Sequence, residues 1–194
     1  MNFLAHAFLA GDAPADQLGG LIGDFVKGPL PAGLPADVAA GVKLHRLIDV
    51  FAETEAAFGR SRARVSPPRR RVAGVIVDMV YDHFLALHWS RFHAEPLDAF
   101  TARMYRLMDA NAALLPPRLL EILPRMRETD WLGSYRSIDS TALALDRIGV
   151  RLSRENLLRG SGADLVADYA GFEADFFAFI GDAQRFAQRW RRER

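Results

Sequence analysis

One apolar segment, residues 67–92, constrains the fold more than any other part of the chain. Two carboxylates and an imidazole, Asp78, Asp82 and His83, lie within it. Its apolar residues cover most faces of a helix, which is typical of a helix at the centre of a bundle. Ionised groups there are costly to desolvate unless they are paired or bound to a cation. The segment therefore predicts an all-α fold and favours metal-assisted chemistry.

Helical spacing of apolar residues recurs along the rest of the chain. It predicts further helices over 3–10, with Asn2 as the cap, and over 16–28, 37–51, 97–115, 117–128, 130–135, 137–149 and 163–189. The prolines and glycine of 29–35 predict a loop, and an arginine-rich connection is expected before the helix that starts at Pro67. No strand, repeat or low-complexity tract is indicated. We expect a single-domain helical bundle over 1–194, with an arginine-rich tail at about 185–194.

Composition narrows the class of protein. Half of the residues are hydrophobic and a quarter are charged, which is typical of a globular domain. The chain has no cysteine, which excludes disulfides and thiolate metal sites. The first residues lack a basic signal region, and no apolar run approaches the roughly 18 residues of a membrane span. We expect a cytoplasmic protein without a membrane or a nucleic acid as partner.

The spacing of acidic residues and histidines predicts where a metal would bind. His45 and Asp49 are four residues apart, as are Asp78 and Asp82, and positions four apart share a helix face. With Asp24 and possibly His6, the ligands would come from four helices, and a bundle core is a known place for such sites. Carboxylates and imidazoles without thiolates favour Mn²⁺, Mg²⁺ or Fe²⁺, and Zn²⁺ is possible.

Several of these residues also have an ordinary structural interpretation. His6 could be a hydrogen-bonded core histidine, and Asp49 could pair with Arg46. A bound divalent ion could activate water and neutralise a phosphoryl group. Lys43 and Arg46 flank His45 and could hold phosphate oxygens. No glycine-rich phosphate loop followed by Lys-Ser or Lys-Thr is present, which argues against a P-loop enzyme.

The basic residues are concentrated and are nearly all arginine. One window without an acidic residue contains Arg60, Arg62, Arg64, Arg69, Arg70 and Arg71. Such a cluster can be an ordinary solvated face, or it can bind an acidic partner.

Several blocks of sequence together resemble one known family. They are Met1-Asn2-Phe3-Leu4-Ala5-His6, Gly23-Asp24-Phe25-Val26-Lys27-Gly28, Leu44-His45-Arg46-Leu47-Ile48-Asp49, Asp78-Met79-Val80-Tyr81-Asp82-His83-Phe84-Leu85 with His88-Trp89, and Trp131-Leu132-Gly133-Ser134-Tyr135. The chain resembles the acyl carrier protein phosphodiesterases, which are related to the HD-domain metal-dependent phosphohydrolases. The resemblance implies hydrolysis of the phosphodiester between 4′-phosphopantetheine and a serine of holo-acyl carrier protein, the carrier of fatty acid biosynthesis, with Mn²⁺ as the usual ion.

The resemblance also implies roles for individual residues. Asp24, His45, Asp82 and His83 would bind the metal, Asp49 and Asp78 would be further ligands or a base for the attacking water, and His6 would bind or support the metal. Some members of the family have a histidine where this chain has Phe8 or Lys43, so neither position can supply an obligatory ligand here. Lys43 could instead contact phosphate.

The expected substrate gives the arginine window a role. Acyl carrier proteins are strongly acidic, so the window would be a docking surface. Two alternatives stay open: an HD-type phosphohydrolase acting on a nucleotide or another small phosphodiester, and a non-enzymatic helical binding module. The sequence does not fix the oligomeric state.

Overall fold

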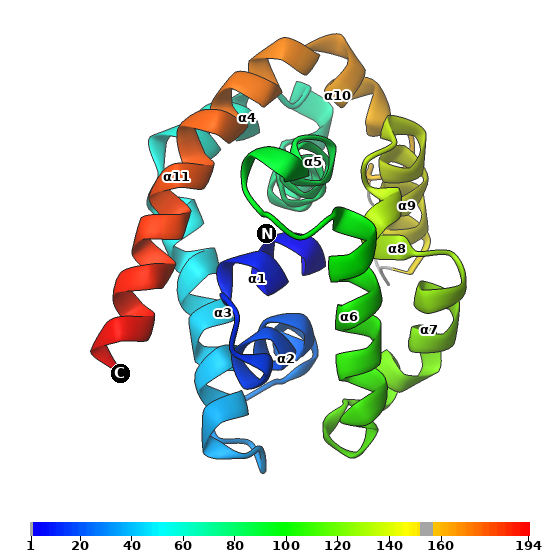
Figure 1. Cartoon of the computed structure of the whole chain (residues 1–194). Helices are drawn as coiled ribbons and strands as arrows, with labels where there is room; N and C mark the ends of the chain where they lie inside the picture. Colours follow the sequence, from blue (N-terminus) through cyan, green and yellow to red (C-terminus); the bar gives the residue numbers. More distant parts are fainter. Residues whose placement is uncertain (1, 152–156) are drawn as a thin grey trace.

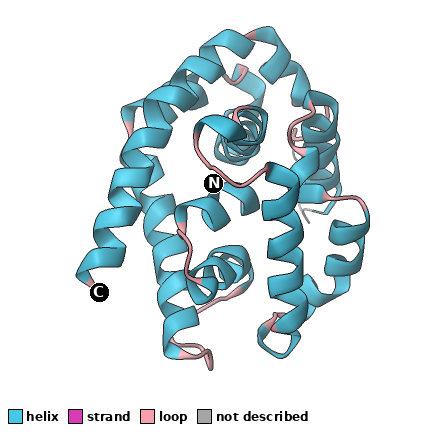
Figure 2. Cartoon of the chain, in the orientation of Figure 1, coloured by secondary structure: helices cyan, strands magenta, loops and turns pink. Residues whose placement is uncertain are grey.

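The computed structural model describes residues 2–151 and 157–194. In this part of the chain the regular structure is entirely helical, as Figure 2 shows, so the predicted all-α class is confirmed. The buried apolar side chains form one continuous cluster. Among the described residues, no helix combines the length and the apolar character that crossing a lipid bilayer requires.

The α-helices and short 3₁₀-helices alternate along the described chain. They are α1 (Phe3–Leu9), α2 (Pro14–Ile22), η1 (Gly23–Phe25), α3 (Ala36–Thr54), α4 (Ala56–Arg64), η2 (Pro67–Val72), α5 (Ala73–Leu87), η3 (Trp89–Arg91), α6 (Leu97–Ala110), η4 (Ala112–Leu114), α7 (Pro117–Glu128), α8 (Trp131–Ser134), α9 (Ile138–Arg151), α10 (Gly162–Ala167) and α11 (Tyr169–Glu193).

Helix α5 lies at the centre of the fold, as its apolar composition predicts. Figure 1 views it end-on, with α4 and α9 on opposite sides of it and α1 beneath it. The predicted 67–92 helix is wrong at both ends, because 67–72 is a 3₁₀ turn and the α-helix ends at Leu87. The arginine-rich connection expected before Pro67 is also wrong over most of its length, since that segment contains α4.

Glycines allow α2 and α3 to pack closely beside α1. A Cβ atom on Gly19 would lie 2.5 Å from the backbone of Gly41 and Val42, and one on Gly41 would lie 2.8 Å from the carbonyl oxygen of Asp16. Only hydrogen fits at these two positions, so the helices meet backbone to backbone. This contact fixes the distance between α3, which contains His45, and α2, which packs on α1.

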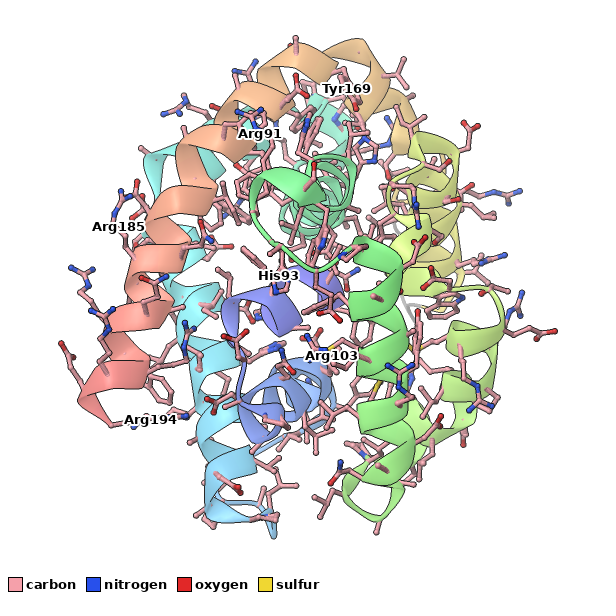
Figure 3. The ribbon with its side chains drawn as sticks, viewed as in Figure 1. Arg91, His93, Arg103, Tyr169, Arg185 and Arg194 are labelled. Atoms are coloured by element: carbon pink, nitrogen blue, oxygen red, sulfur yellow. The ribbon has the colours of Figure 1, made fainter. Side chains whose placement is uncertain are left out.

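The expected arginine-rich tail is the last part of α11. The guanidinium of Arg194 pairs with the buried carboxylate of Asp16 in α2, and Arg191 donates to the carbonyl oxygen of Leu9 at the end of α1. In Figure 3, Arg194 lies at the free end of α11, and Arg103 lies between α6 and α2, where it donates to Gln17 at 2.8 Å. The C-terminal end of the described chain is thus held against the end of α1 and the start of α2.

Candidate functional site

A cavity of about 300 Å³ opens beside α1, between α3, α5 and α9. We call it the acidic cavity, because four carboxylates line it. Its lining residues are Asn2, Asp24, Asp49, Ala52, Glu53, Phe58, Val75, Asp78, Met79 and Ile148. Three of the predicted site residues, Asp24, Asp49 and Asp78, therefore meet in one place.

Two histidines approach these carboxylates. His6 Nε2 lies 3.1 Å from Asp49 Oδ1, and His45 Nε2 lies 3.4 Å from both Asp49 Oδ2 and Asp24 Oδ1. The two imidazole rings stack with their centroids 3.5 Å apart. One ligand atom from each of His6, His45 and Asp49 can be chosen so that all lie within 4.8 Å of one another. The i, i+4 pairing of His45 with Asp49 is as helix geometry predicts.

The orientation of His45 is set by the backbone of α2 and η1. Its Nδ1–H donates to the carbonyl oxygen of Gly20 at 2.8 Å, which directs Nε2 toward the carboxylates. A Cβ atom on Gly23 would lie 2.3 Å from the imidazole ring, so only glycine leaves room for it. A backbone carbonyl on the far nitrogen is the usual support of a metal-binding histidine.

The position of His6 depends on a carboxylate from another helix. Both oxygens of the buried Asp82 accept backbone N–H groups at the start of α1, from Leu4 at 2.9 Å and from Ala5 at 3.0 Å. These groups have no partner within the helix, and a carboxylate there also suits the helix dipole. The predicted cap, Asn2, makes no side-chain capping bond and instead donates to Met79 Sδ and Tyr135 Oη.

The protonation states suit a cation. Burial, reinforced by the neighbouring His45, lowers the pKa of His6 to about 3, so this imidazole is neutral at pH 7. Burial alone would raise the pKa values of Asp24 and Asp49, but hydrogen bonds with the imidazoles hold both below their usual value. Burial raises the pKa of Asp78, and the charges of Asp49 and Asp24 raise it further. A neutral imidazole, as in His6, and ionised carboxylates, as in Asp24 and Asp49, are the forms in which these groups bind metals.

The donor set fits a divalent ion. Two imidazole nitrogens and several carboxylate oxygens converge without a thiolate, a combination typical of Mn²⁺, Fe²⁺ or Mg²⁺, and Zn²⁺ also accepts such ligands. Three carboxylates that share a cavity repel one another unless a cation neutralises them. The residues present could therefore hold a metal at His6, His45, Asp49 and Asp24, beside Asp78.

Asp82 and His83 lie outside this cluster, so the structure gives their predicted role as ligands no support. Both oxygens of Asp82 bind the start of α1, as described above, and burial raises its pKa to about 7 despite these bonds. The imidazole of His83 bonds through Nδ1 to the carbonyl oxygen of Tyr135 at 2.7 Å and through Nε2 to the hydroxyl of Tyr169 at 2.9 Å. Burial also lowers the pKa of His83. Asp82 and His83 therefore make their hydrogen bonds to other groups inside the bundle.

The basic residues expected near phosphate lie outside the lining of the acidic cavity. Lys43 is exposed on α3. Arg46 donates to the carbonyl oxygens of Val26 and Gly28, which fixes the loop after Asp24, rather than pairing with Asp49. Neither side chain lines the cavity, so the structure gives the predicted phosphate contacts no support.

Most of the arginine window is paired within the chain. Arg60 and Arg64 bind the buried Asp175, Arg64 also binds Asp168, Arg69 binds Asp164, Arg62 binds Glu53, and Arg70 donates to the carbonyl oxygen of Ala63. Arg71 is exposed and makes no hydrogen bond or ion pair to the described side chains. Most of the positive charge in this window is therefore neutralised by carboxylates of the same chain.

Sequence reasoning missed some residues that shape the site. Asn2 and Glu53 line the acidic cavity, and Gly20 and Gly23 hold His45 from behind. The glycines at 19, 20 and 23 within an apolar helical pattern were a usable signal, because glycine inside a helix often marks a close approach. Nothing in the sequence pattern marked Asn2 or Glu53.

The chain is similar to known proteins along almost its whole length. A family model described as acyl carrier protein phosphodiesterase matches residues 1–183. A protein of that name from Klebsiella pneumoniae subsp. pneumoniae is 34% identical over 189 residues, which are 97% of this chain and 98% of that protein. Its namesake from Escherichia coli O157:H7 is 35% identical over 180 residues, 92% and 93% of the two chains. No solved structure matches, so the implied likeness to HD domains stays a prediction.

Proposed function

Because the chain belongs to the acyl carrier protein phosphodiesterase family, we propose that its acidic cavity is the site at which it hydrolyses holo-acyl carrier protein. The bond cleaved joins 4′-phosphopantetheine to a serine oxygen, and the products are apo-carrier protein and 4′-phosphopantetheine. One observation supports this location above the others: His6, His45 and Asp49 converge at the wall of a cavity with two further aspartates.

A divalent ion, for which Mn²⁺ is the first candidate, would be held by His6, His45, Asp49 and Asp24. When bound, such an ion acts as a Lewis acid on water and neutralises charge on phosphoryl oxygens. The two histidines are pre-positioned for it, one by the Gly20 carbonyl and the other by the anchoring of α1 to Asp82. Pre-positioning matters because ligands that need no rearrangement cost little to organise.

Asp78 is suited to handle the proton in this reaction. It lines the same cavity, and its raised pKa makes it a better base than an ordinary aspartate. As the water oxygen bonds to phosphorus, Asp78 accepts a proton from this water and the bond from phosphorus to the serine oxygen breaks. The serine oxygen takes up a proton from solvent, and Asp78 releases its proton to solvent. Asp49, whose pKa is held low, stays ionised and remains a ligand.

The test combines metal analysis with mass spectrometry. The purified protein is stripped with a chelator, reloaded with Mn²⁺, and incubated with holo-acyl carrier protein. We expect the carrier protein to lose the mass of 4′-phosphopantetheine in the loaded sample and no such loss in the stripped sample. Metal binding without mass loss would favour a phosphohydrolase acting on another substrate, and absence of both would favour a binding module.

We further infer that the acidic carrier protein docks beside α4 and η2. Arg62 pairs with Glu53 on the wall of the acidic cavity, so this basic segment adjoins the site. Arg70 and Arg71 are exposed next to it. Exposed basic residues near a site mainly accelerate encounter with an acidic partner.

Charge reversal tests this docking surface. The double substitution Arg70→Glu and Arg71→Glu is expected to raise the KM for holo-acyl carrier protein several-fold at low salt, with a smaller effect at high salt, because salt screens exposed charges. Arg118→Glu, an exposed position on α7, is the matched control and should leave KM near its normal value. Equal KM values for the wild type and the double variant at low salt would refute the docking surface.

A further inference from the structure

A second cavity adjoins the acidic cavity and has a different character. This side slot, of about 220 Å³, lies between the start of α1, α8 and α9. Its lining residues are Asn2, Phe3, Thr129, Trp131, Ser134, Tyr135, Ser140, Leu143, Ala144, Arg147 and Ile148. Asn2 and Ile148 line both cavities, so the slot begins at the wall of the proposed metal site.

The side slot combines an apolar surface with hydrogen-bonding groups. Phe3, Ala144 and Ile148 supply apolar surface, and the hydroxyls of Ser134 and Ser140 supply polar groups. The acidic cavity, by contrast, contains four carboxylates and suits a cation and phosphate rather than a neutral chain. An apolar pocket with a few placed polar groups is typical of a site for an organic ligand.

The indole of Trp131 is the most specific feature of the slot. Its Nε1 is buried and has no hydrogen-bond partner among the described residues. A buried donor without an acceptor is costly, so a shift of the ring that brings this N–H to a ligand carbonyl in the slot would be favoured. The preceding Asp130 adopts a left-handed conformation with φ of 40°, and its side chain accepts the N–H of Gly133. Strained backbone of this kind persists where the surrounding structure holds it, often at ligand sites.

The position of the slot indicates how a phosphodiester substrate would be oriented in the acidic cavity. The basic segment that includes Arg62 adjoins the acidic cavity through Glu53, whereas the slot adjoins it through Asn2 and Ile148. In Figure 1, α4 and α9 lie on opposite sides of α5. A phosphodiester in the acidic cavity can therefore extend one substituent toward the basic segment and the other into the slot.

We propose that the side slot binds the pantetheine arm of the substrate while its phosphodiester lies in the acidic cavity. This inference rests on the proposed function, which supplies the substrate. The arm is a neutral chain of amides with a dimethyl-branched carbon, so its methyl groups match the apolar wall, and an amide carbonyl can accept the Trp131 N–H once the indole turns toward the slot. The carrier protein then remains on the side of the arginines.

Two substitutions test the slot. Trp131→Phe removes the indole N–H and keeps an aromatic ring, and we expect it to weaken binding of 4′-phosphopantetheine about tenfold, which corresponds to one charge-free hydrogen bond. Ala144→Phe fills the slot, and we expect a larger loss of affinity together with a raised KM for holo-acyl carrier protein. Both should keep the Mn²⁺ affinity of the wild type, which shows that the fold is intact.

Titration calorimetry with 4′-phosphopantetheine, and with inorganic phosphate as the probe without an arm, gives the readout. Trp190→Phe on α11 is the matched control, because Trp190 does not line the slot, and it should bind 4′-phosphopantetheine as the wild type does. If the wild type binds the two probes equally, or both slot variants bind 4′-phosphopantetheine normally, the slot is refuted. If the wild type does not cleave holo-acyl carrier protein at all, the proposed function itself fails.

Discussion

Replacing His45 with asparagine is expected to reduce Mn²⁺ affinity by more than about 100-fold. Loss of a residue that only supports a metal ligand typically reduces affinity by about 10- to 100-fold, and loss of the ligand itself should cost more. Hydrolysis of holo-acyl carrier protein should fall with it. The imidazole Nε2 faces both Asp24 and Asp49, and the shorter amide cannot reach them. Titration with Mn²⁺ and the kcat/KM for holo-acyl carrier protein measure the two effects.

Two other histidines give the controls for this substitution. His88→Asn removes an imidazole that pairs with Glu173, outside the cluster, and should leave Mn²⁺ affinity unchanged. His83→Asn should lower the melting temperature, because the imidazole hydrogen bonds to the Tyr135 carbonyl and the Tyr169 hydroxyl are lost, yet it should still bind Mn²⁺. Normal Mn²⁺ affinity in His45→Asn, or its loss in His83→Asn, would show that the cluster is not the metal site.

Asp78 and Asp82 are expected to respond in opposite ways to the same conservative change. Asp78→Asn should abolish hydrolysis without loss of stability: burial already disfavours the ionised form, so a neutral amide removes a desolvation cost and the repulsion from Asp24 and Asp49. Asp82→Asn should destabilise the protein by about 1–3 kcal/mol, because the amide nitrogen faces a backbone N–H at the start of α1.

Chemical denaturation and turnover measurements on the two variants separate these roles. Since His6 lies in α1, Asp82→Asn should also weaken Mn²⁺ binding, but turnover should recover when Mn²⁺ is added in excess. Asp78→Asn should stay inactive at any Mn²⁺ concentration. A stable Asp82→Asn protein, or an active Asp78→Asn protein, would contradict the assignment of these two carboxylates.

The sequence was sufficient for the helical class and for part of the site. Apolar periodicity located the buried α5, and the four-residue spacing placed His45 and Asp49 together. The same spacing misled for Asp78 and Asp82. Residues four apart differ by one turn along the axis. Asp78 therefore faces the acidic cavity, whereas Asp82, one turn further along α5, faces the start of α1. Periodicity defines a face but not what packs against it.

The arginine window shows a second limit of local reasoning. The window contains no acidic residue, yet its arginines pair with Asp164, Asp168 and Asp175, about 100 positions later in the chain. A count of charges in a window cannot detect such pairing, because α10 and α11 reach α4 and η2 only in the folded chain. The available basic surface is therefore smaller than the sequence indicated, and it is concentrated at Arg70 and Arg71.

The glycines of α2 have a consequence for how the core can vary. Gly20 supplies the carbonyl that binds His45, and a Cβ atom on it would lie 2.9 Å from the carbonyl oxygen of His6. The separation of the two imidazoles is thus set by main-chain atoms stacked against one another, not by the volumes of leucines and phenylalanines around them. Apolar side chains elsewhere can be exchanged for others of similar size while the spacing of the two histidines stays the same.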